Sequence, residues 1–256
     1  MTQTDLSNTL RALHRPGDPL ILPNAWDAGS ARAVVQAGFA AVATSSGAVA
    51  DSLGHADGEA TPVAEMLGAI GRIAAAVDVP VTADIERGYG LSPGELAERL
   101  LATGAVGCNI EDSDPRTGAL VDPAEQADLL AALRAAAGTD LVVNARIDVF
   151  LRTAGDHRDV LDDAVDRARR YLAAGADCVY PIFLADPELI HRFVEAVAAP
   201  VNVLTRGAGP IPGELAKLGV ARVSYGAGLY HTTKGYLTRM IGAVRDGDNP
   251  YAIAGN

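Results

Sequence analysis

A repeated junction, in which an apolar strand follows a glycine at the end of a helical stretch, constrains this fold more than any other feature. Glycine suits the junction because the residue that closes a helix often adopts a positive φ angle. The pattern therefore predicts four places where a helix gives way to a buried strand. They are 36–43 around Gly38, 103–110 around Gly104, 174–180 around Gly175 and 218–224 around Gly219.

Four further strands complete a regular alternation of strands and helices. They are expected at 19–24, 80–86, 140–146 and 200–204. A helical stretch follows each of the eight strands, at 27–37, 62–77, 93–103, 123–137, 159–174, 186–198, 212–218 and 229–244. Several stretches begin with proline behind a capping side chain, namely Thr61, Ser92, Asp122 and Asp186.

Eight β-α units favour a closed (β/α)₈ TIM barrel, and the lack of any linker predicts one domain over residues 1–256. An open doubly wound sheet is the alternative architecture. That fold normally carries a Gly-x-Gly-x-x-Gly turn after its first strand, whereas residues 23–28 read Pro-Asn-Ala-Trp-Asp-Ala. The sequence therefore favours the barrel.

Charge and composition narrow the classes of partner. The net charge is −11, which disfavours nucleic acid and anionic membranes as partners. The first residues, 1–18, show no basic segment followed by an apolar one, so we expect no secretory signal. With two cysteines, Cys108 and Cys178, no disulfide framework is expected, and we predict a cytoplasmic protein.

Polar side chains alternate along three successive predicted strands. Inside a barrel alternate residues face inward, and the carboxyl ends of the strands form the active face. This period places Asp84 and Glu86 of one strand, Glu111 of the next and Arg146 of the third at the top of one pocket.

The predicted pocket contains oxygen ligands without histidine or cysteine at metal-ligand spacing. All-oxygen sets favour Mg²⁺, with Mn²⁺ as a substitute, and Mg²⁺ commonly keeps several waters. The alternative is that the carboxylates cap helices or pair with Arg87 and Arg146. We predict a metal site with the ligands Asp57, Asp84, Glu86 and Glu111.

Arg146 and the turn 44–47 are the candidate substrate-binding groups. The planar guanidinium suits a carboxylate or an enolate oxygen, although it could simply neutralise Glu111. Small residues in Thr44-Ser-Ser-Gly47 let backbone N–H groups approach a substrate carboxylate, with the Ser46 hydroxyl beside them. An ordinary small-residue turn is the alternative for this segment.

Two other features carry weaker predictions. Cys108 and Cys178 are expected to be small core residues beneath the helices. The glycines of 206–209 and 225–228 follow the last two strands, where many barrels bind phosphate, but they equally suit tight turns.

Several motifs together resemble the isocitrate lyase/phosphoenolpyruvate mutase superfamily, over residues 20–230. They are Pro23-Asn-Ala-Trp-Asp-Ala, Ser46-Gly47, Leu53-Gly54 with Asp57, Asp84-Ile-Glu86 with Gly88-Tyr-Gly90, Ile110-Glu111-Asp112 and Asn144-Ala-Arg146. The resemblance implies a (β/α)₈ barrel that uses Mg²⁺ to cleave or form C–C or P–C bonds of small oxo- or hydroxycarboxylates. It implies Asp84 as the direct metal ligand, with Asp57, Glu86 and Glu111 holding its waters.

The resemblance also assigns the substrate carboxylate to Ser46 and Gly47, and enolate stabilisation to Arg146. It implies a homo-oligomer, a dimer or a tetramer. Many members exchange C-terminal helices between paired subunits, and the short segment after Tyr230 argues against an exchange in this chain.

One segment departs from the family pattern. Isocitrate and methylisocitrate lyases carry a Lys-Lys/Arg-Cys-Gly-His segment after the glutamate that matches Glu111, and this chain reads Asp112-Ser-Asp-Pro-Arg-Thr-Gly118. Those two activities are therefore not expected, and residues 112–121 are the candidate closing loop. We predict a Mg²⁺-dependent C–C lyase or decarboxylase. The alternatives are P–C bond chemistry or a non-catalytic barrel that binds metal and carboxylate.

Overall fold

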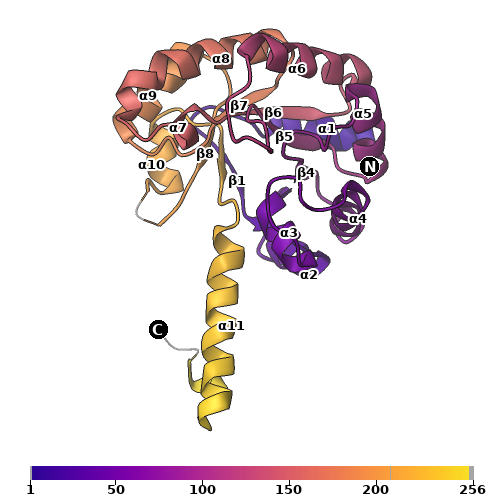
Figure 1. Cartoon of the computed structure of the whole chain (residues 1–256), viewed down its shortest axis with the longest axis vertical. Helices are drawn as coiled ribbons and strands as arrows, with labels where there is room; N and C mark the ends of the chain where they lie inside the picture. Colours follow the sequence, from indigo (N-terminus) through magenta and orange to yellow (C-terminus); the bar gives the residue numbers. More distant parts are fainter. Residues whose placement is uncertain (1, 208, 254–256) are drawn as a thin grey trace.

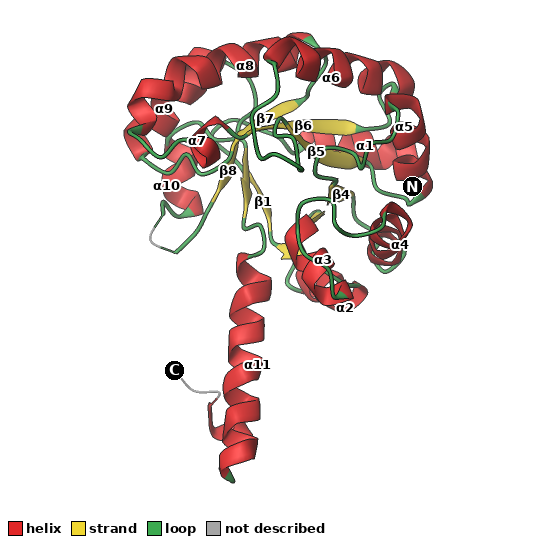
Figure 2. Ribbon diagram, in the orientation of Figure 1, coloured by secondary structure: helices red, strands yellow, loops and turns green. Residues whose placement is uncertain are grey.

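The computed structural model describes residues 2–207 and 209–253, in which a parallel β-barrel is surrounded by helices, as the sequence predicts (Figures 1 and 2). The strands are β1 (Leu20–Leu22), β2 (Asn24–Ala25), β3 (Val42–Thr44), β4 (Val81–Asp84), β5 (Gly107–Glu111), β6 (Val142–Ile147), β7 (Cys178–Pro181), β8 (Asn202–Leu204) and β9 (Arg222–Ser224). The helices are α1 (Gln3–Ala12), α2 (Ala28–Gln36), α3 (Ser46–Leu53), α4 (Val63–Ala74), α5 (Pro93–Ala102), α6 (Pro123–Ala137), α7 (Val149–Arg152), η1 (His157–Val160), α8 (Leu161–Ala173), α9 (Pro187–Val197), α10 (Pro212–Lys217), α11 (Gly228–Asp246) and η2 (Pro250–Ile253).

The strands close into a ring through β1 and β2. These two elements are one stretch of chain interrupted at Pro23, which has no N–H to donate to a ladder. β1 pairs with β9, and β2 pairs with β3. From β3 to β7 each strand pairs with the next, and a bridge between Val179 and Val201 joins β7 to β8. All the strand pairings are parallel.

The helix-to-strand junctions follow the sequence pattern. Gly38, Gly104, Gly175 and Gly219 all adopt positive φ, between 82° and 102°. Three of the expected caps form: Ser92, Asp122 and Asp186 each accept a hydrogen bond from a backbone N–H of the first helical turn. The fourth is wrong. α4 begins behind Pro62, and no hydrogen bond within the described residues reaches the buried Thr61 hydroxyl.

Helix α1 is an element that the strand–helix alternation did not predict. Its Leu10 side chain is fully buried and packs with residues of the barrel interior, including Leu22 and Val142. A β-carbon on Gly107 would lie 2.7 Å from Leu10 Cδ2, so glycine is needed for this close approach. The helix thus closes the end of the barrel that lies opposite the carboxyl ends of the strands.

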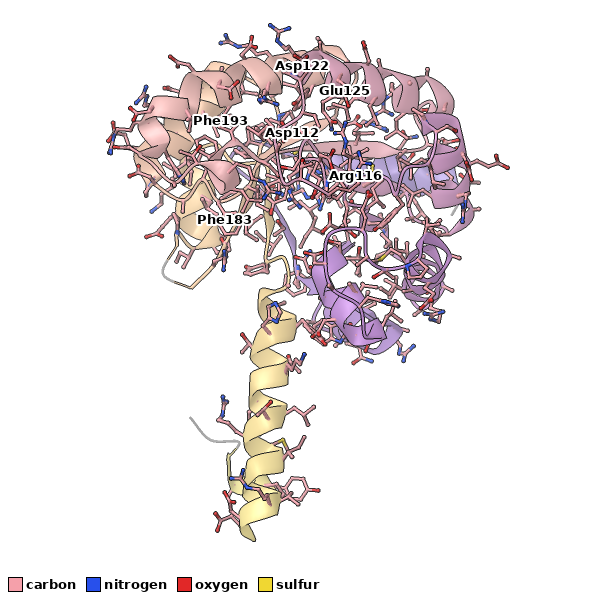
Figure 3. The ribbon with its side chains drawn as sticks, viewed as in Figure 1. Asp112, Arg116, Asp122, Glu125, Phe183 and Phe193 are labelled. Carbon is pink, nitrogen blue, oxygen red and sulfur yellow. The ribbon has the colours of Figure 1, made fainter. Side chains whose placement is uncertain are left out.

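The last long helix, α11, departs from the expected arrangement. The eighth β-α unit should lay its helix on the barrel, yet α11 projects away from it like a stem (Figure 1). None of its described residues is buried, and its side chains stand clear of the barrel along most of its length (Figure 3). Within the described residues, no helix combines the length and apolarity needed to cross a membrane.

Candidate active site

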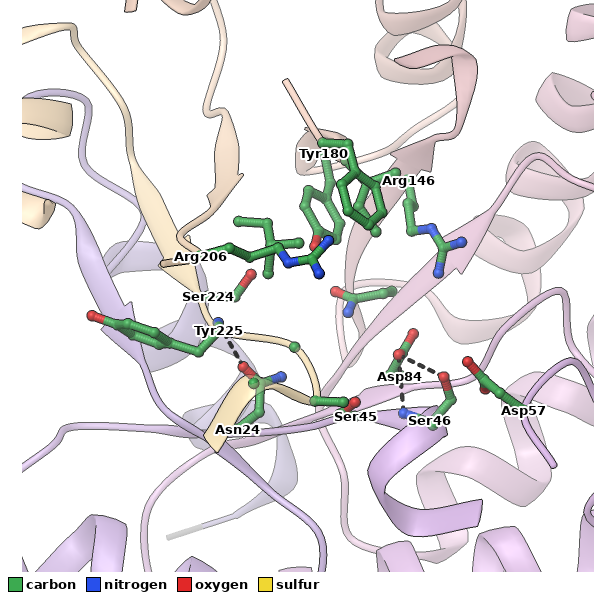
Figure 4. Close-up of a pocket in the computed structure, with 18 of the residues that line it drawn as sticks. Asn24, Ser45, Ser46, Asp57, Asp84, Arg146, Tyr180, Arg206, Ser224 and Tyr225 are labelled. Carbon is green, nitrogen blue, oxygen red and sulfur yellow. Dashed lines mark hydrogen bonds between the residues drawn. The ribbon is translucent and has the colours of Figure 1, made fainter. Parts of the chain in front are cut away.

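A cavity of about 340 Å³ opens at the carboxyl ends of the strands (Figure 4). Strand register brings the polar residues together there, because Asp84 pairs with Asn109, and Arg146 pairs with both Glu111 and Tyr180. The cavity is lined by Asn24, Ser45, Ser46, Gly47, Asp57, Asp84, Asn109, Arg146, Leu151, Tyr180, Ile182, Phe183, Leu204, Arg206, Ser224, Tyr225, Gly226, Ala227, Gly228 and His231.

Asp84, at the end of β4, is fixed by two residues of the neighbouring β3–α3 segment. Its Oδ2 accepts hydrogen bonds from Ser46 N at 3.0 Å and from Ser46 Oγ at 2.9 Å (Figure 4). Its own N–H donates to Thr44 Oγ1 at 2.9 Å. The sequence 44–47 is therefore not a simple turn. It leads from β3 into the first turn of α3, where Ser45, Ser46 and Gly47 line the cavity.

The carboxylate of Asp57 lies directly over Gly47. A β-carbon on Gly47 would be 2.9 Å from Asp57 Oδ2, which leaves room for glycine alone. Desolvation raises the pKa of Asp57, and the negative charge of Asp84 raises it further. Two carboxylates thus share one side of the cavity, and their repulsion favours a cation between them.

Glu86 is buried just behind this pair and does not line the cavity. It adopts the left-handed φ of 51°, and its side chain accepts a hydrogen bond from the backbone N–H of Glu59. Burial raises the pKa of Glu86 to about 7, and the charge of Asp57 contributes in the same direction. The loop of Glu59 is in turn held by hydrogen bonds from the N–H groups of Arg87 and Tyr89 to Glu59 Oε1.

Arg146 is the best-braced side chain of the site. Its Nε and Nη2 donate to both oxygens of the fully buried Asp148, at 2.6 and 2.9 Å, and its Nη1 lies 2.5 Å from Glu111 Oε2. Burial raises the pKa of Glu111, and the Arg146 guanidinium opposes that shift. Arg146 therefore pairs with Glu111, which was one of the two roles considered for it from the sequence. It also lines the cavity, where it can contact a substrate.

The donor set suits Mg²⁺ bound mostly through waters. Asp57 and Asp84 offer carboxylate oxygens to the cavity, the ligands that a hard cation prefers. Among the described residues, no three His, Cys, Asp or Glu side chains lie close enough together to ligate one ion directly. Of the four predicted metal residues, Asp57 and Asp84 line the cavity, whereas Glu86 and Glu111 lie behind it. This arrangement fits one direct ligand supported by water-mediated contacts.

Residues 112–121 form an anchored hairpin, closed by an antiparallel bridge between Ser113 and Leu120. At its base the buried Asp112 accepts hydrogen bonds from Tyr171 Oη at 2.7 Å and from Arg167 Nη1 at 3.1 Å. None of its residues lines the cavity, and Arg116 is exposed and pairs with Asp114. Closure of this loop over the site remains a prediction.

Asn24, Tyr180 and Arg206 are polar cavity residues that the sequence did not single out for the catalytic site. Asn24 links two strands, because its Nδ2 donates to the carbonyl oxygen of Thr44 and its Oδ1 accepts from Tyr225 N. Tyr180 is the inward residue of β7 beside Arg146, and strand alternation could have identified it. Arg206 follows β8 and begins the segment 206–209, which the sequence offered only as a possible phosphate site.

The predictions for the two cysteines and for the two glycine segments had different outcomes. Cys108 packs in the main core with the outer helices, as expected. Cys178 was misplaced, because it pairs in register with the inward-facing Asn144 and faces the barrel interior. The glycine segments act as turns, since Gly209 N donates to Arg206 O at 2.7 Å and Gly228 N donates to Tyr225 O at 3.0 Å. Those two N–H groups are therefore not available to a phosphate.

Residues 10–245 match the family model described as phosphoenolpyruvate phosphomutase. An uncharacterized protein of Mycobacterium tuberculosis, Rv1998c, is 38% identical, over 94% of this chain and 92% of its own length. The 2-methylisocitrate lyase of Escherichia coli is 31% identical, over 78% of this chain and 74% of its own length.

Solved structures agree with these relatives. A Burkholderia cenocepacia protein provisionally assigned as a phosphonomutase has a TM-score of 0.89 and 44% identity, covering 93% of this chain and 99% of its own. A phosphonopyruvate hydrolase in complex with oxalate and Mg²⁺ has a TM-score of 0.82 and 26% identity, covering 97% of this chain and 89% of its own.

Proposed function

The chain belongs to the isocitrate lyase/phosphoenolpyruvate mutase superfamily, and from that membership we propose a single-domain Mg²⁺-dependent C–C lyase or decarboxylase. Its substrate would be a small 2-oxo- or 2-hydroxycarboxylate, cleaved through an enolate. The observation that carries the proposal is the cavity itself, where Asp57 and Asp84 lie on one side and the braced Arg146 lines the same space (Figure 4).

Asp84 would hold the cation directly, through the carboxylate oxygen that Ser46 leaves free. Asp57, Glu86 and Glu111 would hold its waters. When bound, Mg²⁺ supplies a Lewis acid for the oxygens of the substrate and for the charge that develops on them. Support comes from the carboxylate oxygens of Asp57 and Asp84, and from the related phosphonopyruvate hydrolase, which was solved with oxalate and Mg²⁺.

Arg146 would stabilise the developing enolate oxygen. Because Asp148 and Glu111 hold the guanidinium in one orientation, little reorganisation accompanies the reaction, which is how preorganised charge lowers a barrier. Ser46 and Gly47 would bind the substrate carboxylate through the first turn of α3. Burial raises the pKa of Tyr180, so its hydroxyl stays protonated where it lines the cavity.

Calorimetric titration of oxalate, an enolpyruvate mimic, with and without Mg²⁺ tests this proposal. We expect the wild type to bind oxalate only with the metal, and Asp84→Ala to lose that binding. Asp128→Ala, on the exposed face of α6, is the matched control and should bind as the wild type does. Oxalate binding that is indifferent to Mg²⁺ and to Asp84 would refute the proposed site.

P–C bond chemistry is the second candidate, favoured by the phosphomutase family model and by the 44% identical phosphonomutase-like structure. A screen of oxo- and hydroxycarboxylates beside phosphonopyruvate separates the two. Release of inorganic phosphate or formation of phosphoenolpyruvate would assign the P–C reaction, whereas two carbon fragments would assign the lyase. Tight oxalate binding without turnover of any of these compounds would assign a binding protein.

The proposal extends to assembly as a homo-oligomer. Leu237, Ile241 and Val244 form an exposed apolar stripe on α11, with more than half of each residue accessible. Beside the start of α11 lies an apolar groove of about 670 Å³, lined by side chains such as Trp26, Val34 and Phe39. In the proposed oligomer a second copy of the chain would cover this stripe.

A further inference from the structure

Arg206 extends into the catalytic cavity across the face of an aromatic ring. Its Cζ lies 4.6 Å from the centroid of the Phe183 ring, a separation at which a guanidinium is attracted to the ring face. Both residues line the cavity, and Ile182 and Leu204 add apolar surface around them. Figure 4 shows Arg206 and Arg146 reaching the same space from different strands, with Asp84 and Asp57 beyond.

The backbone holds both members of this pair in restricted positions. Phe183 adopts a φ of 66°, a conformation that is unfavourable for a bulky residue and persists mainly where the surroundings impose it. Arg206 sits in a tight turn, in which Gly209 N donates to its carbonyl oxygen and Thr205 Oγ1 donates to Pro210 O at 3.1 Å. The ring and the guanidinium are thus brought together by two separate loops.

The two arginines of the cavity differ in how their charge is compensated. Of the described lining residues, only Arg146 and Arg206 carry a permanent positive charge. Arg146 is paired with two buried carboxylates, Glu111 and Asp148. For Arg206, no carboxylate within the part of the chain described lies within 4.0 Å. A cation held beside apolar side chains without a counter-ion is a ready partner for a ligand anion.

We propose that Arg206, supported by the ring of Phe183, binds a second anionic group of the substrate. This inference rests on the proposed function, in which the first carboxylate and its neighbouring oxygen occupy the metal end of the cavity. The distal group is a carboxylate, so the small oxo- or hydroxycarboxylate of the proposed function is a dicarboxylate. Arg206 is therefore the residue that determines specificity, and a neutral or shorter substrate leaves its charge unpaired.

Calorimetry at saturating Mg²⁺ with oxalate, lactate and malate tests this assignment. Oxalate and lactate occupy only the metal end, whereas malate adds a distal carboxylate to the lactate framework. We expect Arg206→Gln to weaken malate binding about 10- to 100-fold, as loss of a charge-assisted hydrogen bond predicts, and to leave oxalate within about twofold. Arg206→Lys should restore part of the malate affinity, because it keeps the charge and loses the planar fork.

Two control variants refine the result. Phe183→Leu removes the aromatic face and should weaken malate binding less than Arg206→Gln does. Arg170→Gln, on the exposed face of α8, should change the binding of neither ligand. The same variants are also titrated with 3-phosphonolactate, which carries a distal phosphonate in place of the distal carboxylate of malate. If Arg206→Gln weakens 3-phosphonolactate binding more than malate binding, the distal group is a phosphonate.

The outcomes separate this inference from the function on which it rests. If the wild type binds oxalate with Mg²⁺ but Arg206→Gln weakens malate no more than oxalate, the distal anion site is refuted and the metal site stands. If the wild type binds malate no more tightly than lactate, the same conclusion follows. If oxalate binding shows no dependence on Mg²⁺, the proposed function fails, and this inference fails with it.

Discussion

The β-carbon position of Gly47 lies 2.9 Å from Asp57 Oδ2, so the backbone of α3 and this carboxylate are in direct contact. The contact joins the segment proposed for the substrate carboxylate to one of the proposed metal residues. A change at either residue should therefore disturb both functions together.

Gly47→Ala should displace Asp57 and weaken Mg²⁺-dependent oxalate binding, by about 10- to 100-fold if Asp57 supports the metal through water. Titration of Mg²⁺ in the presence of oxalate measures the loss. Gly94→Ala is the matched control, because a β-carbon there meets no atom within 4 Å. Unchanged affinity in Gly47→Ala would show that Asp57 is not part of the metal site.

Thr44→Val should remove the acceptor for the Asp84 N–H while keeping the size of the side chain. A buried donor without a partner costs about 1–3 kcal/mol, so we expect a lower free energy of unfolding and weaker Mg²⁺ binding. Urea denaturation and calorimetry measure the two effects. Thr44→Ser keeps the hydroxyl and should recover most of both, and failure to do so would contradict a positioning role for Thr44.

His14 should make stability fall in mild acid. Burial lowers its pKa to about 4, and the Arg222 charge acts in the same direction. The unfolded chain, with a histidine pKa of 6.5, therefore takes up this proton first. The stabilisation is complete above pH 6.5 and is lost as the pH falls towards 4, by up to about 3 kcal/mol.

Urea denaturation of wild type and His14→Asn between pH 4.5 and 7.5 measures this contribution. Asparagine can still donate to the Leu10 carbonyl oxygen that His14 Nδ1 contacts at 2.8 Å, but it does not titrate. The difference between the two proteins should shrink as the pH falls. His191→Asn, on the exposed side of α9, is the control, and a constant difference for His14 would contradict the prediction.

Leu237→Asp with Ile241→Asp should dissociate the proposed homo-oligomer, because both side chains are exposed in the isolated chain and would be covered by a second copy in that assembly. Light scattering with size exclusion gives the mass directly. Lys217→Asp on α10 controls for the change in net charge. A monomeric wild type, or an oligomer unaffected by the double substitution, would refute a role for α11 in assembly.

The sequence determined the barrel and the core of the site through short-range rules. Glycines at helix ends and the period of two along β4, β5 and β6 were sufficient to place Asp84, Glu111 and Arg146 at one end of the barrel. These rules work because strand geometry fixes which face each side chain occupies, whatever the rest of the fold does. The capping pattern failed at Thr61, because Pro62 and not Thr61 occupies the N-cap position of α4.

Tertiary structure alone decided the features that depend on contacts between distant segments. The sequence does not show that α1 closes the barrel with Leu10 or that α11 leaves it. The contact between Arg206 and Phe183 could not be predicted from the sequence either, because the two residues lie on loops that follow different strands. Local propensity determines an element and its faces, whereas the meeting of two elements depends on the whole packed chain.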